Sequence, residues 1–348
     1  MPTLNLNYEP QVFADTSKMS RQEWLQTRRY GIGGSEASII MGVSPFATCR
    51  DLFFDKRGVK PVSMDPEETN RIAKEVGNRL EELVAVIFSK KTGLEVYPDK
   101  KMYQHSLFPF MKADVDFVIY FPDGRKGILE CKTTNYNCQF KWKDNAVPVN
   151  YEWQCRHYMA VMNVDVVYIV CLYGNNDSEY FIRKIERDLD IEQELINAEK
   201  KFWEDYVEAG VEPPYTEAPD LVLESLRKFT GPADKKLPPV SITGDVKGQL
   251  EKYLELAERK AALDKEKREI EKEQKLLSIP FVEQLGQCCR ASFTYGTEKY
   301  EITYNPTNRR NVNKENIMKL ENLYPDAYED VVTESVSRTF KVKKELPV

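Results

Sequence analysis

Hydrophobic periodicity predicts alternating helices and strands over the first two thirds of the chain. Apolar residues recur at helical spacing in residues 67–91. The stripe that they form consists of Ile72, Val76, Leu80, Leu83, Val84 and Ile87. Three strand-like runs follow, over residues 94–103, 112–121 and 126–133, and the Pro-Asp-Gly sequence at residues 122–124 predicts a hairpin turn between the last two.

The same pattern continues to about residue 209. It predicts a helix over residues 150–162, a strand over 164–173, a strand over 179–185 and a helix over 188–209. The run at 164–173 is continuously apolar, which is typical of a strand buried on both faces. The order αβββαβ predicts an α/β fold in which a mixed central sheet is flanked by helices.

Short helices are predicted before this core. Ser20 and Glu23 have the spacing of a capping box, which satisfies free amide groups at a helix start. The glycines of the GIGG sequence at residues 31–34 end that helix, and we expect Ser35 to cap the next one. A third helix is expected over residues 48–56.

The C-terminal part has a different character. Leucine or isoleucine recurs every seven residues in a charged helix over residues 247–277, but the partner positions are polar, so we do not expect a strong coiled coil. Two strands, a short helix and a last strand are then predicted at residues 291–296, 299–304, 314–320 and 337–344. The expected domains are a core at 1–210, an acidic proline-rich linker at 211–245 and a C-terminal helical and α+β extension at 246–348.

Composition narrows the possible chemistry. The 348 residues include two histidines, which argues against a histidine-rich zinc site and a Ser/His/Asp triad. The seven cysteines lack CxxC spacing, no apolar run has the length of a membrane helix, and the N-terminus lacks the pattern of a signal peptide. We therefore expect a reducing, cytoplasmic location.

The net charge of −6 is unevenly distributed. Residues 186–225 contain thirteen Asp or Glu and three Lys or Arg, a net charge of −10, so the rest of the chain carries +4. A nucleic-acid partner is therefore not excluded.

Two carboxylates and a lysine are the sharpest chemical signal. A hairpin brings Asp116 towards Glu130, and Lys132 shares a strand face with Glu130. Two carboxylates with a backbone carbonyl suit Mg²⁺ or Mn²⁺ rather than zinc, and a nearby lysine can orient or deprotonate an activated water. The alternative is a salt-bridge ladder on an exposed sheet face. Glu81, on the long helix, is a further candidate ligand or else a solvated carboxylate.

Two other segments carry candidate residues. Gln154 and Tyr158 are four residues apart and share a helix face, so both side chains can point into one site. The alternative is that Gln154 lies on the helix surface and Tyr158 at the edge of the core. Arg28 and Ser35 border the glycine-rich turn, where a helix start and a guanidinium can bind phosphate. The alternative for this turn is a flexible connection between helices.

Taken together, these segments resemble one family. The D…ExK arrangement is the hallmark of PD-(D/E)XK (restriction-endonuclease-like) nucleases. The combination of W-x3-R…GIGGSEA, G-N-x-x-E, A-D-V-D, E-C-K and Q-x2-H-Y resembles the YqaJ-like viral recombinases, relatives of phage lambda exonuclease. The resemblance covers about residues 20–210. Glu36 stands where many relatives have Asp, and Glu82 stands where many have Pro.

The resemblance implies specific roles. The metal ligands fall on Glu81, Asp116, Glu130 and the carbonyl of Cys131, and the resemblance implies two Mg²⁺ or Mn²⁺ ions per site. The catalytic set falls on Lys132, Glu130, Asp116 and Gln154. The 5′-phosphate and DNA-binding residues fall on Arg28, Ser35 and Tyr158.

The implied activity is 5′→3′ exonuclease digestion of linear double-stranded DNA. It releases 5′-phosphomononucleotides and leaves 3′ overhangs for phage-type recombination by strand annealing. The implied partners are DNA ends, a RecT-like single-strand annealing protein and further copies of the chain in a trimeric ring, in the host cytoplasm if a phage encodes the chain. The alternatives are an endonuclease of the same fold, or a non-catalytic module that binds DNA ends or the annealing protein.

Overall fold

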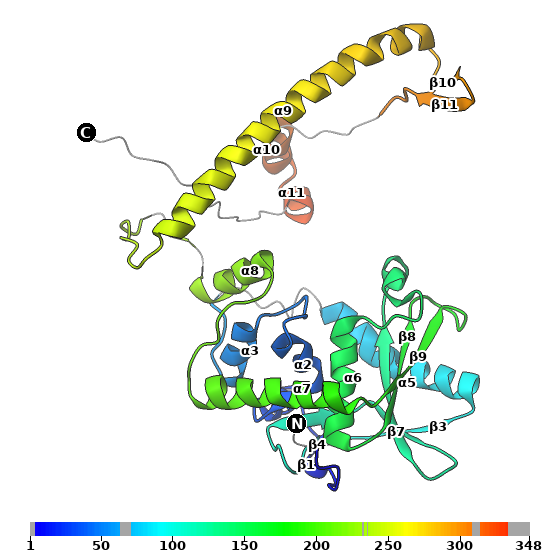
Figure 1. Cartoon of the computed structure of the whole chain (residues 1–348), viewed down its shortest axis with the longest axis vertical. Helices are drawn as coiled ribbons and strands as arrows, with labels where there is room; N and C mark the ends of the chain where they lie inside the picture. Colours follow the sequence, from blue (N-terminus) through cyan, green and yellow to red (C-terminus); the bar gives the residue numbers. More distant parts are fainter. Residues whose placement is uncertain (1–3, 63–70, 232, 235, 308–313, 333–348) are drawn as a thin grey trace. The chain divides into compact units, whose positions relative to one another are not determined.

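The chain divides into two compact units, residues 1–232 and 233–348 (Figure 1). The computed structural model describes residues 4–62, 71–231, 233–234, 236–307 and 314–332.

A five-stranded mixed sheet forms the centre of the first unit. Its strands are β3 (Glu95–Pro98), β6 (Phe117–Tyr120), β7 (Lys126–Thr133), β8 (Val166–Leu172) and β9 (Tyr180–Glu186), in the order β3-β6-β7-β8-β9. The β7–β8 pair is parallel and the other pairs are antiparallel. The predicted mixed sheet is confirmed, and β8 is buried along nearly its whole length, as its continuous apolar sequence predicts.

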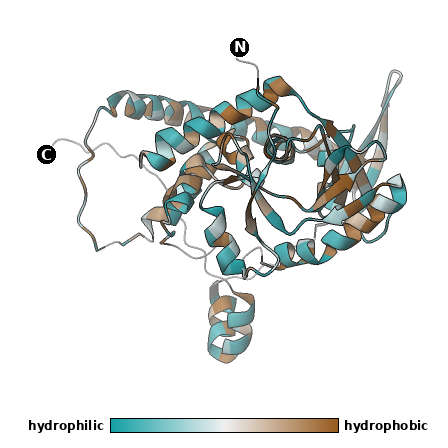
Figure 2. Cartoon of the chain, turned by 90° about the horizontal axis from the view of Figure 1, so that it is seen from below, coloured by the Kyte–Doolittle hydropathy of each residue, from teal (hydrophilic) through white to brown (hydrophobic). Residues whose placement is uncertain are grey.

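Two helices cover opposite faces of this sheet. On one face, Val84 and Phe88 of α5 (Arg71–Thr92) pack against Leu129 of β7. On the other, Met159 of α6 (Val149–Met162) packs against Ile128. Consecutive β7 residues thus face different helices. Figure 2 shows hydrophobic residues, in brown, concentrated in the strands between the helices.

The apolar stripe of α5 is buried over its C-terminal half. Val84 and Ile87 are buried, whereas Ile72, Val76 and Leu83 are exposed. The predicted helix is confirmed, but only part of its stripe is buried, because the sheet covers the C-terminal turns of the helix and the N-terminal turns extend beyond this cluster.

Two of the predicted strands are each divided between two sheets. A second sheet, in the order β1-β4-β5-β2, contains β1 (Gln11–Asp15), β4 (Lys101–Gln104), β5 (Met111–Asp114) and β2 (Ile32–Gly33). The run at 94–103 thus becomes β3 and β4, and the run at 112–121 becomes β5 and β6. As a result, Asp116 lies at the junction between the sheets and not within a strand.

The N-terminal helices are held by side-chain caps. In α1 (Arg21–Arg28), the Ser20 hydroxyl accepts from the Glu23 amide, and the Glu23 carboxylate accepts from the Ser20 amide, which confirms the capping box. For α2 (Gly34–Ile40) the expected cap is wrong. Gly33 occupies the N-cap position, and its amide donates to the Glu36 carboxylate at 2.8 Å. Helix α3 spans Cys49–Lys56, with Thr48 as its cap.

The acidic stretch begins at the end of β9 and includes α7 (Leu189–Lys201), which continues as a π-helical segment, η2 (Phe202–Glu208). Two of its carboxylates are buried and paired. Glu199 contacts His157 Nδ1 at 2.7 Å, and Glu192 pairs with Arg187 at 2.6 Å. Part of the net negative charge therefore stabilises the interior rather than facing solvent.

The stretch predicted to be a linker, residues 211–245, contains a helix packed on the first unit. Helix α8 (Pro219–Thr230) begins with proline, which is compatible with the first helical position. The buried Ser225 donates to Asp51 at 2.8 Å, and the rings of Phe229 and Phe54 lie 4.3 Å apart. Clustered prolines suggested a linker, but the amphipathic segment after Pro219 docks on α3.

The second unit contains a long charged helix and a hairpin. Helix α9 (Lys247–Leu285) exceeds its predicted end by eight residues, and its heptad positions Leu256, Leu263, Ile270 and Leu277 are exposed within the unit. The hairpin β10 (Arg290–Tyr295) and β11 (Glu298–Thr303) is followed by α10 (Lys314–Leu323) and α11 (Pro325–Val331). The strand predicted at 337–344 lies outside the described residues. No described helix combines the length and apolar character needed to cross a membrane.

Candidate active site

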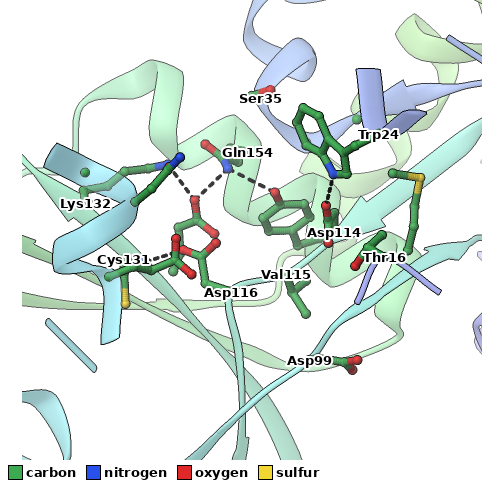
Figure 3. Close-up of a pocket in the computed structure, with 18 of the residues that line it drawn as sticks. Thr16, Trp24, Ser35, Asp99, Asp114, Val115, Asp116, Cys131, Lys132 and Gln154 are labelled. Carbon is green, nitrogen blue, oxygen red and sulfur yellow. Dashed lines mark hydrogen bonds and ion pairs between the residues drawn. The ribbon is translucent and has the colours of Figure 1, made fainter. Parts of the chain in front are cut away.

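One pocket of about 640 Å³ in the first unit is lined by every candidate site residue that the sequence analysis named (Figure 3). These lining residues are Arg28, Ser35, Glu81, Asp116, Glu130, Cys131, Lys132, Gln154 and Tyr158. They come from α1, α2, α5, the β5–β6 junction, β7 and α6. Glu82, the neighbour of Glu81, is exposed and is not among the lining residues.

The β6–β7 hairpin brings the carboxylates together. Phe117 pairs with Leu129, so the preceding Asp116 lies beside Glu130 and Cys131. Asp116 Oδ2 accepts from the Cys131 amide at 2.8 Å. Because the N–H and C=O of one strand residue point to the same side, the Cys131 carbonyl faces the edge occupied by Asp116. Lys132 Nζ donates to Glu130 Oε1 at 2.6 Å (Figure 3).

Helix α6 contributes polar side chains to the pocket lining. Gln154 Nε2 donates to Glu130 Oε1 at 2.7 Å and lies 3.1 Å from the Tyr158 hydroxyl. Both side chains are buried. One oxygen of Glu130 thus receives hydrogen bonds from both Lys132 and Gln154. The other oxygen, Oε2, is buried without a hydrogen-bond partner among the described residues.

The electrostatics of the carboxylates favour a cation. Burial, followed by the charges of Glu130 and Glu81, raises the pKa of Asp116 well above its usual value. Burial also raises the pKa of Glu81, and Glu130 adds to that effect. A divalent cation would relieve this repulsion and satisfy Glu130 Oε2, and the all-oxygen donor set fits Mg²⁺ or Mn²⁺.

The carboxylates do not form a closed metal cage. Among the described residues, no three His, Cys, Asp or Glu side chains are placed to hold a metal ion together. Mg²⁺ commonly binds through one or two carboxylates and keeps several waters, so a closed cage is not required for it.

Arg28 is held by three neighbours. Its Nη2 donates to Ser35 Oγ at 2.9 Å and to Glu36 at 3.0 Å, and the guanidinium lies 4.8 Å from the Trp24 ring centroid. Glu36 also pairs with the buried Lys56 at 2.6 Å. Burial opposes ionisation of Glu36, but Lys56 and Arg28 outweigh burial and lower its pKa. Glu36 is therefore a charged anchor for Arg28.

Comparison with known proteins decides the family. Residues 23–165 match the model of the YqaJ-like viral recombinase domain. The chain is 32% identical to the protein YqaJ of Bacillus subtilis (strain 168) over 337 residues, which cover 96% of this chain and 98% of that protein. The chain belongs to the YqaJ family.

Solved structures also share similarity with this YqaJ family member. An alkaline exonuclease, LHK-Exo of Laribacter hongkongensis, matches with a TM-score of 0.45 and 19% identity, covering 59% of this chain and 98% of that one. A phage-related exonuclease of Haemophilus somnus 129PT matches with a TM-score of 0.38 and 16% identity, covering 52% and 96%.

The glycines of the GIGG turn make room for side chains that line the pocket. A Cβ on Gly31 would lie 2.5 Å from the Phe110 carbonyl oxygen and 2.6 Å from Lys112 Cγ, and one on Gly33 would lie 3.1 Å from Arg28 Nη2. A Cβ on Gly34 would lie 2.4 Å from the Tyr158 ring. The turn was predicted to present free amides, but the Gly33 amide is already bonded to Glu36, so close approach of side chains accounts better for its composition.

Several other lining residues of this chain received no role from the sequence, among them Trp24, Lys112, Asp114 and Tyr151. Trp24 Nε1 donates to Asp114 Oδ2 at 2.6 Å, and Lys132 Nζ lies 5.0 Å from the Tyr151 ring centroid. Burial lowers the pKa of Lys112 to about 8. Lys112 and Asp114 alternate with Asp116 along the chain, which could have indicated that they share its side. Tyr151 lies three residues before Gln154, which could have indicated that the two share a helix face.

Proposed function

We propose that this YqaJ family member is a metal-dependent PD-(D/E)XK nuclease that digests linear double-stranded DNA in the 5′→3′ direction. The proposed products are 5′-phosphomononucleotides and 3′ overhangs for recombination by strand annealing. The observation that carries the proposal is the convergence of Asp116, Glu130, Lys132 and Gln154 in one pocket that Arg28 and Ser35 also line.

The proposed cofactor is Mg²⁺ or Mn²⁺, two ions per site. Glu81, Asp116, Glu130 and the Cys131 carbonyl would hold the ions, which supply Lewis-acid activation of water and stabilisation of the departing oxygen. The orphaned, buried Glu130 Oε2 supports this assignment.

Lys132 is proposed to act as a cation. Burial alone would lower its pKa, but Glu130 and Asp116 outweigh burial and raise the pKa. An ammonium with a raised pKa is better suited to orient water and stabilise phosphate charge than to remove a proton. Gln154 shares its carboxylate partner and is proposed to fix that carboxylate.

Arg28 and Ser35 are proposed to hold the 5′-phosphate, with Tyr158 forming part of the binding wall. Their mutual hydrogen bond at 2.9 Å supports a preorganised pair of donors. A guanidinium offers bidentate geometry to phosphate oxygens, which would retain the strand between successive cuts.

The decisive experiment compares the wild type with Glu130→Ala and Lys132→Ala on 5′-phosphorylated linear duplex with Mg²⁺. We expect both variants to lose digestion while binding DNA, because each lacks a reacting-centre side chain. A matched pair sharpens this test: Glu81→Gln is expected to lose activity and Glu82→Gln to retain it, since only Glu81 lines the pocket. Undiminished digestion by Glu130→Ala would refute the assignment.

A covalently closed circle separates the exonuclease from an endonuclease of the same fold. The exonuclease leaves the circle intact, whereas an endonuclease opens it. A non-catalytic module that binds DNA ends or the annealing protein would release no nucleotide from either substrate. The family resemblance further supports a RecT-like annealing partner and a trimeric ring. Analytical ultracentrifugation of the full chain tests the trimeric state.

A further inference from the structure

Lys112 is a buried lysine without a carboxylate partner in the described part of the chain. Its residue surface is 4% exposed, and Nζ donates to Gln104 Oε1 at 2.7 Å. Nζ also lies 3.4 Å from the centroid of the Phe13 ring. By contrast, the buried Lys56 has the Glu36 carboxylate at 2.6 Å. Burying an ammonium without an anion is costly, so the Lys112 environment favours a ligand that supplies negative charge.

The position of Lys112 relates it to the proposed reaction. Lys112, Asp114 and Asp116 alternate along the chain, and all three line the pocket. At the rise of a strand, Lys112 is at most about 14 Å from Asp116, on the side away from the hairpin. Lys112 is therefore a pocket residue beyond the carboxylates.

Two glycines bring the Lys112 stem and the Arg28 guanidinium to one side of the same short segment. Gly31 leaves room for the Lys112 stem, whose Cγ and Cε would lie 2.6 and 2.8 Å from an added Cβ. Gly33 leaves room for the guanidinium of Arg28 in the same way, at 3.1 Å. Residues two apart in extended chain point to the same side, so the lysine stem and the guanidinium lie on one side of this segment.

We propose that Lys112 is a specificity-determining residue for a terminal phosphate monoester, acting together with Arg28. A monoester carries about 1.5 to 2 negative charges at neutral pH, whereas each phosphodiester of the DNA backbone carries one. A second cation that lines the same pocket as Arg28 favours the more highly charged group. This inference rests on the proposed nuclease function and names the residue that distinguishes a phosphorylated 5′ end.

A purely structural role makes the opposite prediction for stability. If Lys112 served only to hold Gln104 across β4 and β5, its replacement would lower the melting temperature and leave end preference unchanged. If Lys112 is kept for binding, Lys112→Met removes a buried charge and leaves the melting temperature equal or higher, while end preference falls.

The test measures binding of the full chain to duplexes with 5′-phosphate or 5′-hydroxyl ends, in EDTA, by fluorescence anisotropy. We expect the wild type to prefer the phosphorylated end, and Lys112→Met to reduce that preference about tenfold, the size of one charge-assisted hydrogen bond. Lys112→Gln serves as a second variant if Lys112→Met does not fold. Lys101→Met, which removes an exposed lysine of β4 outside the pocket lining, is expected to keep the preference.

An unchanged ratio of the two affinities in both Lys112 variants would overturn the inference, as would a wild type without end preference. Digestion with Mg²⁺ in parallel separates the two proposals. A wild type that releases no nucleotide refutes the nuclease function, and the affinity ratio in EDTA still decides the role of Lys112.

Discussion

Gly34 shows how a single missing side chain shapes the pocket. Its Cα faces the Tyr158 ring so closely that an added Cβ would lie 2.4 Å from Cε1 and 2.8 Å from Cζ. Tyr158 is buried and bonded to Gln154, so its ring has little room to retreat. The glycine therefore sets the distance between α2 and α6 at the site.

We expect Gly34→Ala to lower the free energy of unfolding by about 1–3 kcal/mol, the usual cost of overpacking. Displacement of Tyr158 should also disturb Gln154 and reduce digestion. Gly77→Ala is the control, since its Cβ would meet only Thr133 Oγ1 at 3.6 Å and alanine favours the helix. Urea unfolding of both variants measures the difference, and equal stability would contradict the steric argument.

Lys112 predicts a pH dependence of stability. Burial lowers its pKa from 10.5 to about 8 in the folded chain. Between these values the unfolded chain binds a proton that the folded chain does not, so this residue makes stability rise with pH in that window. Below about pH 8 the lysine is charged in both states, and the folded state then carries the full free-energy cost of burying that charge.

Unfolding curves from pH 7 to 10.5 should therefore differ between the wild type and Lys112→Met. The variant has no lysine at this position, so only the wild type gains stability from it as the pH rises. The difference in free energy of unfolding between the two proteins therefore narrows. A difference that is constant across the window would show that Lys112 keeps an ordinary pKa when folded.

At the scale of elements, α1 connects helix capping to the proposed binding of phosphate. The capping box of Ser20 and Glu23 starts the helix that carries Trp24 and Arg28. Trp24 in turn bonds Asp114 on β5, so the helix is fixed at its first turn and at its middle.

Ser20→Ala is expected to lower stability by about 1 kcal/mol, the usual value of a lost N-cap. Fraying of α1 should also weaken the preference for phosphorylated ends through Arg28. Ser20→Asp preserves a capping oxygen and should behave like the wild type. Thermal unfolding together with end-binding affinity checks both effects.

Local patterns predicted most elements of the core but not their assignment to sheets. The alternation of Ala113, Val115, Phe117 and Ile119 continues through the β5–β6 junction, so nothing in it signals a change of sheet. Sheet membership depends on partners far along the chain, such as β1 and β2. Helix α8 was missed for a related reason, because its burial depends on α3, about 170 residues earlier.

The candidate site was easier to predict than its supporting residues. Asp116, Glu130 and Lys132 follow from strand alternation and a hairpin, which are local rules. The contacts that hold Arg28 involve Glu36 and Trp24, and the latter reaches Asp114 ninety residues away. Such pairings require the folded chain, and periodicity carries no information about them.

At the scale of the molecule, the boundary of the first unit lies after α8. The predicted core ended at residue 210, whereas the compact unit extends to Pro232. Ser225 and Phe229 of α8 fill positions against α3. The acidic segment 186–225 contributes no residue to the pocket lining, so the mildly basic remainder of the chain forms the site.

A chain ending at Pro232 should therefore fold cooperatively and keep metal-dependent digestion. A chain ending at Gly210 lacks α8 and exposes Phe54, so we expect a lower melting temperature and greater sensitivity to protease. Thermal unfolding and limited proteolysis of the two truncated chains test this. Equal stability would place the boundary at Gly210.

The pocket is assembled from residues between Thr16 and Tyr158, and the helix carrying Tyr158 is packed against β8 and α7. During translation, the two halves of the reactive centre leave the ribosome far apart in time. Under the proposed nuclease function, the nascent chain therefore acquires a complete pocket only after α6 has left the ribosome.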